Sequence, residues 1–298
     1  METIDIRCCP LCGSRHIEEA FVCIDRYASG ETFHVCRCAD CGFRFTGDAP
    51  VEAEIGRYYE SPDYISHTDT ERGAMNTVYH WVRSYMLRRK AELVKRLSGK
   101  TCGRLLDIGS GTGYFANTMM QRRWQVDTIE KSAAARGFAR QKFGLDTWTE
   151  DAYAAIADGT YDVITLWHVM EHIERINDLW SGLHRWLKDD GLLLVAVPNC
   201  SSYDAQHYKE DWAAYDVPRH LWHFTPDTME RFARKWGFRL TTVKPMPFDA
   251  FYVSMLTEQH LGRTMSFVRG MLTGTGALLA SWGDRQKSSS LIYAFEKE

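Results

Sequence analysis

Three glycines at alternate positions form the first pattern that could bind a ligand. Gly109, Gly111 and Gly113 follow a short apolar run that contains Asp107, and they precede a helical pattern that begins near Tyr114. Glycine lets a strand-to-helix turn approach a ligand without Cβ clashes. A dinucleotide site needs Gly-x-Gly-x-x-Gly, and the spacing here departs from it, which disfavours NAD. We expect a nucleotide-like ligand at this turn.

Acidic side chains follow the next two strand patterns. Glu130 ends one apolar run, where a carboxylate can accept hydrogen bonds from both hydroxyls of a ribose. Asp151 follows the next short segment, where it could accept a hydrogen bond from the exocyclic amine of adenine. Either acid alone is readily explained as surface charge. Their order after Asp107 predicts a nucleoside-containing ligand, and Trp167, at the end of the strand pattern 161–167, joins the candidates.

Histidines that could act as a general base gather after two further strand patterns. They are His168 and His172, which flank Glu171, and His220 and His223 in the loop 215–224. Histidine titrates near neutral pH and is the usual proton acceptor. We take His172, His220 and His223 as catalytic candidates, and favour His172 or His220 over His168. Ordered structural histidines, or favourable electrostatics at a helix start, are the alternative explanations.

Seven of the nine cysteines precede residue 42, which indicates a local site and not a framework for the whole chain. Two Cys-x-x-Cys-Gly knuckles supply the ligand candidates Cys9, Cys12, Cys38 and Cys41. Four thiolates at this spacing suit a closed, structural Zn²⁺ site, whereas buried thiols or a redox pair are the alternative. Cys8 and Cys36 flank the knuckles and could replace two of these ligands, and Cys23 is expected to pack in a core.

Short apolar runs alternate with helical patterns after Gly99, which predicts a doubly wound α/β domain with a mostly parallel sheet. Strands are predicted at 104–108, 125–129, 161–167, 192–197, 238–243 and 290–295. Helices are predicted at 114–122, 133–142, 169–187 and 227–236. In such sheets ligands bind beyond the carboxyl ends of the strands, where the candidate residues lie.

Three segments follow from these patterns: a zinc ribbon over 1–48, a connector and amphipathic helix over 49–98, and a catalytic domain over 99–298 with a helical insertion at about 251–287. The helix over 76–97 has a basic face. This face is either solvated or in contact with a phosphate or acidic substrate.

The bulk properties exclude several classes of partner. The 298 residues carry a net charge of -3, so no nucleic acid partner is expected. The N-terminus lacks a basic region followed by an apolar run, and the apolar stretch 270–282 is shorter than the roughly 20 residues of a membrane span. We expect a cytoplasmic protein without a membrane span. The oligomeric state is left open.

These motifs together resemble class I S-adenosylmethionine-dependent methyltransferases. The resemblance covers about residues 100–245 and rests on Leu-Leu-Asp-Ile-Gly-Ser-Gly-Thr-Gly, Glu130, Asp151, the segment 161–172 and Val197-Pro198-Asn199. It implies a Rossmann-like sheet of seven strands. By resemblance the glycine turn holds the methionine part of S-adenosylmethionine, Glu130 the ribose and Asp151 the adenine, while Asp107 orients the loop.

The acceptor is indicated only by looser resemblances. The N-terminal zinc ribbon and the connector tyrosines resemble sugar C-methyltransferases that act on nucleotide-activated deoxysugars. The His-x-x-Glu-His segment partly resembles quinone-ring O-methyltransferases, in which acidic residues and a histidine can hold a divalent cation, but His168 stands where that pattern has an acid. The function expected is methyl transfer to an oxygen or carbon of a small acceptor, a nucleotide-sugar or other carrier-linked metabolite. A non-catalytic scaffold that binds a macromolecule through the zinc module and the basic helix, and an NAD-dependent oxidoreductase, are the alternatives.

Overall fold

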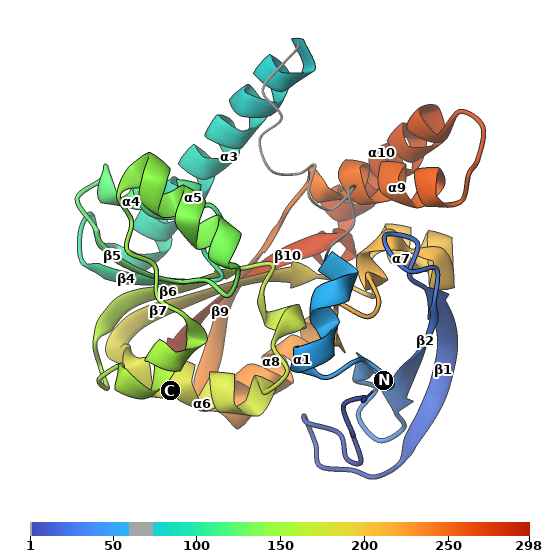
Figure 1. Cartoon of the computed structure of the whole chain (residues 1–298), viewed down its shortest axis with the longest axis horizontal. Coiled ribbons are helices and arrows are strands. Elements are labelled where there is room, and N and C mark those ends of the chain that lie inside the picture. The colour runs from blue at the N-terminus through green and yellow to red at the C-terminus, as the bar shows by residue number, and fades with distance from the viewer. Residues whose placement is uncertain (1, 60–73) are drawn as a thin grey trace.

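The computed structural model of the chain describes residues 2–59 and 74–298, and is built around a mostly parallel six-stranded sheet (Figure 1). The strand order is β5-β4-β6-β7-β10-β9, in which β10 runs antiparallel to both of its neighbours. The strands are β4 (Arg104–Ile108), β5 (Gln125–Ile129), β6 (Tyr161–Trp167), β7 (Leu187–Pro198), β9 (Phe238–Pro245) and β10 (Ser290–Lys297). The predicted doubly wound α/β class is confirmed.

Helices cover both faces of this sheet because apolar residues of each central strand point to both sides. The helices are α3 (Ala74–Ser98), α4 (Tyr114–Met120), α5 (Ala133–Phe143), α6 (Ile176–Trp186) and α8 (Pro226–Lys235). Leu105 and Val163 pack on the face that α3 and α4 cover. Leu106 and Ile164 pack on the opposite face, under α6 and α8. Both faces of the sheet are therefore core.

The predicted count of seven strands is wrong for the described part of the chain, where the sheet has six. The segment after α5 makes a single parallel bridge between Trp148 and Ile129. The Trp148 amide donates to the Thr128 carbonyl at 2.9 Å, and the Trp148 carbonyl accepts from the Glu130 amide at 3.0 Å. Pairing stops there because a 3-10 turn, η2 (Glu150–Ala155), begins two residues later.

The helix predicted over 169–187 begins later than expected. A 3-10 turn, η3 (Met170–His172), comes first, and α6 starts only at Ile176. Ile173 between them is extended, with ψ of 115°. This irregular, non-helical segment forms part of the wall of the cavity described below.

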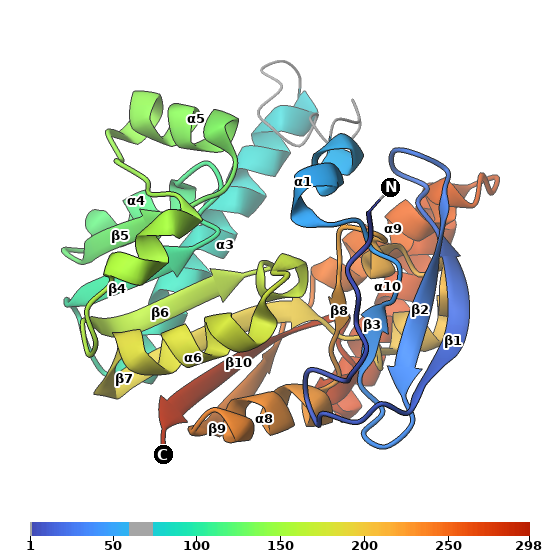
Figure 2. The same cartoon turned by 60° about the horizontal axis from the view of Figure 1, so that its bottom comes forward.

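The N-terminal segment forms a second sheet that takes its last strand from the α/β domain. Strands β1 (Ile17–Ile24), β2 (Thr32–Cys38) and β3 (Arg44–Thr46) are joined by β8 (Trp222–His223) in the order β1-β2-β3-β8 (Figure 2). Arg44 pairs with His223 in this ladder. The predicted ribbon over 1–48 is therefore bonded by backbone to the loop that carries two candidate histidines.

Two helices of the predicted insertion, α9 (Asp249–His260) and α10 (Ser266–Gly283), pack against each other and project from the sheet (Figure 1). The remaining short elements are α1 (Glu52–Ile55), η1 (Gly56–Tyr59), α7 (Tyr203–Tyr208), η4 (Lys209–Asp211), η5 (Ala213–Tyr215) and η6 (Arg285–Lys287). Among the described residues, no helix combines the length and apolar character needed to cross a bilayer.

Candidate active site

A cavity of about 1410 Å³ opens beyond the carboxyl ends of β4, β5 and β6. Ligands of doubly wound sheets bind at this edge. The glycine turn, Glu130, Trp167, His168 and His172 all line the cavity. Its far side is closed by η1 and by side chains of α3. One chamber thus combines the residues predicted for a nucleoside ligand with two of the four candidate histidines.

Gly111 is the point of the glycine turn that faces the cavity. Its φ is +54°, and a Cβ added there would meet no atom within 4 Å. A Cβ at Gly109 would instead collide with Val169, and one at Gly113 would lie 2.7 Å from Leu145. The outer two glycines therefore allow the turn to pack, while Gly111 leaves room for a ligand.

Two acidic groups lie beside the turn, and Glu130 bonds to it directly. The Glu130 carboxylate accepts hydrogen bonds from the Gly111 and Ser132 amides, each at 2.8 Å. Asp107 is buried and accepts a hydrogen bond from Thr165 Oγ1 at 2.7 Å. Burial raises the pKa of Asp107 to about 7, against the opposing effects of Thr165 and the nearby Lys90 ammonium. Both residues line the cavity together with Gly111.

The cavity wall contains buried polar atoms without a hydrogen-bond partner among the described residues: Ser110 Oγ, Tyr153 Oη and Trp167 Nε1. Such groups are costly unless a ligand or water satisfies them. Asp151 is exposed and absent from the lining, whereas its neighbour Glu150 lines the cavity. The adenine contact predicted for Asp151 stays a prediction, and Glu150 is the acid on the cavity side of that turn.

His172 lines the cavity as an unprotonated imidazole. Burial and the nearby His220 lower the pKa of His172 to about 4. Its Nδ1 lies 3.0 Å from the Arg219 carbonyl oxygen and 3.2 Å from Tyr59 Oη. A carbonyl can only accept, so Nδ1 carries the ring proton and Nε2 keeps its lone pair. His172 can therefore accept a proton at Nε2.

His168 lines the same cavity in the opposite protonation state. Nδ1 lies 3.4 Å from Glu171 and Nε2 lies 3.3 Å from Asp249. Although burial opposes a charge on the ring, the carboxylates of Asp249 and Glu171 raise the pKa of His168 to about 9. His168 also has φ of +58°, a left-handed conformation that non-glycine residues adopt at a cost of about 1–2 kcal/mol. It is an imidazolium at neutral pH.

The other two candidate histidines do not line the cavity. His220 is mostly buried, with Nδ1 2.9 Å from the Ala214 carbonyl, and its ring centroid lies 4.6 Å from that of His172. His223 Nε2 lies 3.2 Å from Thr46 Oγ1, and burial lowers the pKa of His223 well below its usual value. Ligand atoms of Glu171, His172 and His220 lie within 4.8 Å of one another. His220 therefore does not line the cavity itself, but its ring contacts His172, which does.

A buried ion network connects the N-terminal sheet to His172. The fully buried Arg219 guanidinium lies 2.9 Å from Asp25, in the β1–β2 turn, and 2.6 Å from Asp216. Arg219 Nη1 also donates to the Tyr58 carbonyl at 2.8 Å. The carbonyl of this same arginine faces His172 Nδ1. The N-terminal sheet therefore helps to fix the backbone that orients His172.

The sequence patterns missed Tyr59, Lys90, Glu150 and Asp249 as residues of the site or its wall. Lys90 lies on α3, with Nζ 4.3 Å from the Trp167 ring centroid, and burial lowers its pKa against the attraction of Asp107 and Asp249. The basic face of the predicted helix 76–97 was the signal that could have found it. Tyr64 and the rest of the connector between residues 60 and 73 lie outside the described residues.

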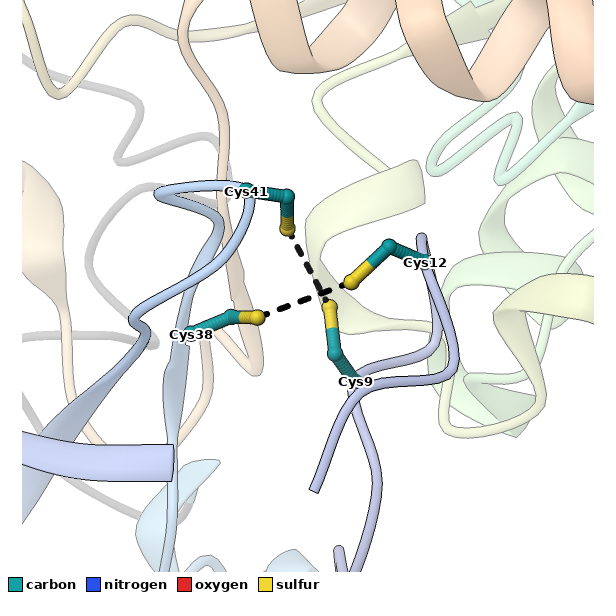
Figure 3. Close-up of side chains that lie close together, drawn as sticks. All are labelled: Cys9, Cys12, Cys38 and Cys41. Atoms are coloured by element: carbon teal, nitrogen blue, oxygen red, sulfur yellow. Dashed lines mark hydrogen bonds between the residues drawn. The ribbon is translucent and has the colours of Figure 1, made fainter. Parts of the chain in front are cut away.

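The two cysteine knuckles fold into equivalent turns that bring four sulfurs together. Cys9 Sγ lies 3.5 Å from Cys41 Sγ, and Cys12 Sγ lies 3.6 Å from Cys38 Sγ (Figure 3). All four sulfurs lie within 4.8 Å of one another and point to one centre. Ligands of a tetrahedral zinc with bonds of about 2.3 Å are about 3.8 Å apart. Cys8 and Cys36 lie outside this group, and Cys23 packs in a core as predicted.

Comparison with known proteins identifies the chain. Residues 82–243 match a family described as a methyltransferase domain. The chain belongs to this family. It is a class I S-adenosylmethionine-dependent methyltransferase, as the motifs of the glycine turn and the sheet predicted. The sequence match spans β4 to β9 and so includes every element that lines the cofactor side of the cavity.

Similar proteins share about a quarter of the residues in the matched region. The ubiquinone biosynthesis O-methyltransferase of Burkholderia orbicola (strain MC0-3) is 26% identical over 166 residues, which cover 51% of this chain and 70% of that protein. An uncharacterized methyltransferase of Staphylococcus carnosus is 24% identical over 144 residues, covering 48% and 68%. The crystal structure of an S-adenosylmethionine-dependent methyltransferase from Archaeoglobus fulgidus is 18% identical, with a TM-score of 0.46 and coverage of 74% and 100%.

Proposed function

We propose that this enzyme methylates an oxygen or carbon of a small acceptor that binds beside S-adenosylmethionine in the cavity, with His172 as the base. One observation carries the proposal: an unprotonated His172 and the open face of Gly111 line the same chamber. Its volume of about 1410 Å³ exceeds the usual 300–1,000 Å³ of a single-ligand pocket. There is room for a cofactor and an acceptor together.

The residues around Gly111 suit each part of S-adenosylmethionine. In this proposal Glu130 binds the ribose hydroxyls, and Glu150 or Asp151 receives the adenine amine. Asp107 and Lys90, an acid and a base that attract each other and both line the cavity, match the ammonium and carboxylate of the methionine part. Ser110 Oγ and Trp167 Nε1 gain the partners that they lack. When bound, S-adenosylmethionine supplies a methyl group on a sulfonium, an electrophile that needs alignment more than activation.

The acceptor must lose a proton when a hydroxyl or acidic carbon is methylated. His172 Nε2 accepts this proton, while the Arg219 carbonyl holds the Nδ1 proton and so fixes the tautomer. His220 and His223 are positioning residues in this arrangement, because neither lines the cavity. A nucleotide-sugar or other carrier-linked metabolite, suggested by the N-terminal resemblance, is the acceptor class that we propose to test first.

We further propose that Cys9, Cys12, Cys38 and Cys41 bind one structural Zn²⁺. The sulfur spacing fits a tetrahedron, and four protein ligands leave no open position for chemistry. The ion would stabilise the sheet that contains β8 and the turn that carries Asp25. Through Arg219, that sheet supports the position of His172.

The experiment is to incubate the purified protein with S-adenosylmethionine and fractions of a metabolite extract, and to measure S-adenosylhomocysteine. Release that depends on one fraction, with a product one methyl group heavier by mass spectrometry, supports the proposal and identifies the acceptor. Binding of S-adenosylmethionine by calorimetry with no release from any fraction would instead favour the scaffold alternative. Binding of NAD in place of S-adenosylmethionine would contradict the assignment of the cavity.

A further inference from the structure

Helix α10 turns its large apolar side chains away from the protein. Trp282 is 74% exposed, Met265 70%, Leu272 69% and Phe267 67%. The α10 apolar face consists of Met265, Phe267, Val268, Met271, Leu272, Leu279 and Trp282. From Phe267 to Trp282 these positions recur at spacings of three, four and seven residues along the helix, so they lie on one side of it, with Thr275 between Leu272 and Leu279.

The opposite side of α10 is made of small residues. Gly270, Gly274, Ala277 and Ser281 are buried. Gly270 lies against Met255 of α9, and Gly274 lies against Phe251. A surface helix of a soluble protein ordinarily buries its large apolar side chains and exposes polar ones. In α10 this order is reversed, which is the arrangement expected of a face that binds something outside the chain.

The α10 apolar face also presents few groups that could form hydrogen bonds with a polar partner. The hydroxyl in the middle of the stripe, Thr275 Oγ1, donates to the Met271 carbonyl within the helix at 2.8 Å. On the other side, Ser281 Oγ donates to the Leu278 carbonyl at 2.7 Å. Protein interfaces carry about one hydrogen bond per 100–200 Å². A surface whose hydroxyl is already satisfied suits hydrocarbon better than another protein.

Positive charge borders this face although the chain as a whole has a net charge of -3. The segment 261–287 contains one acidic residue, Asp284, and four basic ones. Arg263 is paired with Glu258 of α9 at 3.2 Å, so the positive excess comes from Arg269, Arg285 and Lys287. Basic residues beside exposed tryptophan, phenylalanine and leucine are typical of helices that lie in the interface of an anionic membrane. Because no described helix is long and apolar enough to cross a bilayer, such a helix would lie on the surface.

We propose that the α10 apolar face binds the surface of a bilayer with anionic headgroups, with the apolar stripe in the acyl boundary and the basic residues at the headgroups. The α9–α10 pair adjoins the active site, since Asp249 at the start of α9 lies 3.3 Å from His168 Nε2. Membrane binding therefore brings the cavity close to the bilayer. The inference rests on α10 alone and does not depend on the proposed base or acceptor.

The test measures co-sedimentation of the full chain with vesicles. One set contains phosphatidylcholine and phosphatidylglycerol in equal amounts, and the other contains phosphatidylcholine only. We expect binding to the mixed vesicles, and a partition coefficient at least about 10²-fold lower for the double variant Phe267→Glu/Leu272→Glu, because two large apolar side chains stay out of the acyl region. The double variant Arg269→Gln/Lys287→Gln should lose about 25-fold on the mixed vesicles, about fivefold for each charge.

Met120→Glu is the matched control, because Met120 is 43% exposed at the end of α4, away from the α10 apolar face. It should bind vesicles like the wild type. Thermal unfolding and S-adenosylmethionine affinity should be unchanged in all variants, which shows that they are folded. Equal binding of the wild type to both vesicle sets, or none to either, would overturn the proposal. So would self-association that Phe267→Glu/Leu272→Glu abolishes in the absence of vesicle binding, since the face would then join two copies.

Discussion

Replacing Gly111 with alanine should damage cofactor binding far more than folding. A Cβ at Gly111 meets no protein atom within 4 Å, so no clash is added to the fold. The cost is the left-handed backbone at φ of +54°, about 1–2 kcal/mol for a residue with a Cβ. For a domain of this size the melting temperature should fall by about 2–8 °C.

The space that the new methyl group enters is the cavity itself. If the methionine part of S-adenosylmethionine packs against Gly111, the methyl group takes space that the ligand needs. Overpacking of this kind costs about 1–3 kcal/mol. At about 1.4 kcal/mol for each tenfold change, Kd should rise by about 5- to 150-fold, which isothermal titration calorimetry can resolve. Gly111→Val, with a branched Cβ, should abolish measurable binding.

Gly99→Ala separates backbone strain from occupation of the cavity. Gly99 has φ of +67°, its Cβ would also meet no atom within 4 Å, and it does not line the cavity. The melting temperature should fall by a similar amount in the two variants, while only Gly111→Ala should bind S-adenosylmethionine more weakly. An unchanged Kd for Gly111→Ala, or equal losses of affinity in both variants, would refute the placement of the methionine part at this turn.

The remaining predictions concern the histidines and the thiol cluster. His172→Gln should lower turnover by roughly 10²- to 10⁴-fold with little change in cofactor affinity. It should also remove the acidic limb of the pH profile near the pKa of about 4. An equal loss of turnover in His220→Gln would contradict His172 as the base. The raised pKa of His168, about 9, stabilises the fold fully below its unfolded value of about 6.5, and this stabilisation is lost as pH rises through 9. The difference in melting temperature between wild type and His168→Gln should therefore be largest near pH 6 and vanish above pH 9; a constant difference would show that the ion pairs do not form. Elemental analysis should find one zinc per chain in the wild type and in Cys8→Ser, and none in Cys12→Ser. Turnover should be lower in the zinc-free variant. Retention of zinc by Cys12→Ser would reject the ligand set.

Local patterns were sufficient for the central elements. The bounds predicted for 104–108, 125–129 and 161–167 agree with β4, β5 and β6, because each is a short apolar run closed by turn residues. Each Cys-x-x-Cys-Gly knuckle also forms within a few residues, with the Gly13 and Gly42 amides donating to the carbonyls of Cys9 and Cys38. Such features depend on neighbours in the chain, so the sequence alone determines them.

The long-range arrangement could not be inferred in this way. The number of strands depended on how far the segment at Trp148 pairs with β5 before η2 begins. The second partner of β3 is β8, which lies almost 180 residues later in the chain. Whether Asp151 or Glu150 faces the cavity was decided by the direction of a single 3-10 turn.

Protonation was decided by tertiary structure alone. His168 and His172 are four residues apart and have the same ordinary pKa, yet the first lies between two carboxylates and the second is buried beside His220. The carbonyl that fixes the His172 tautomer belongs to Arg219, whose guanidinium is paired with Asp25 near the start of the chain. The sequence determined the cofactor fold and the cysteines proposed as metal ligands, because local spacing specifies them. The protonation of the proposed base, His172, was decided by the tertiary structure, because burial and a distant histidine set its pKa.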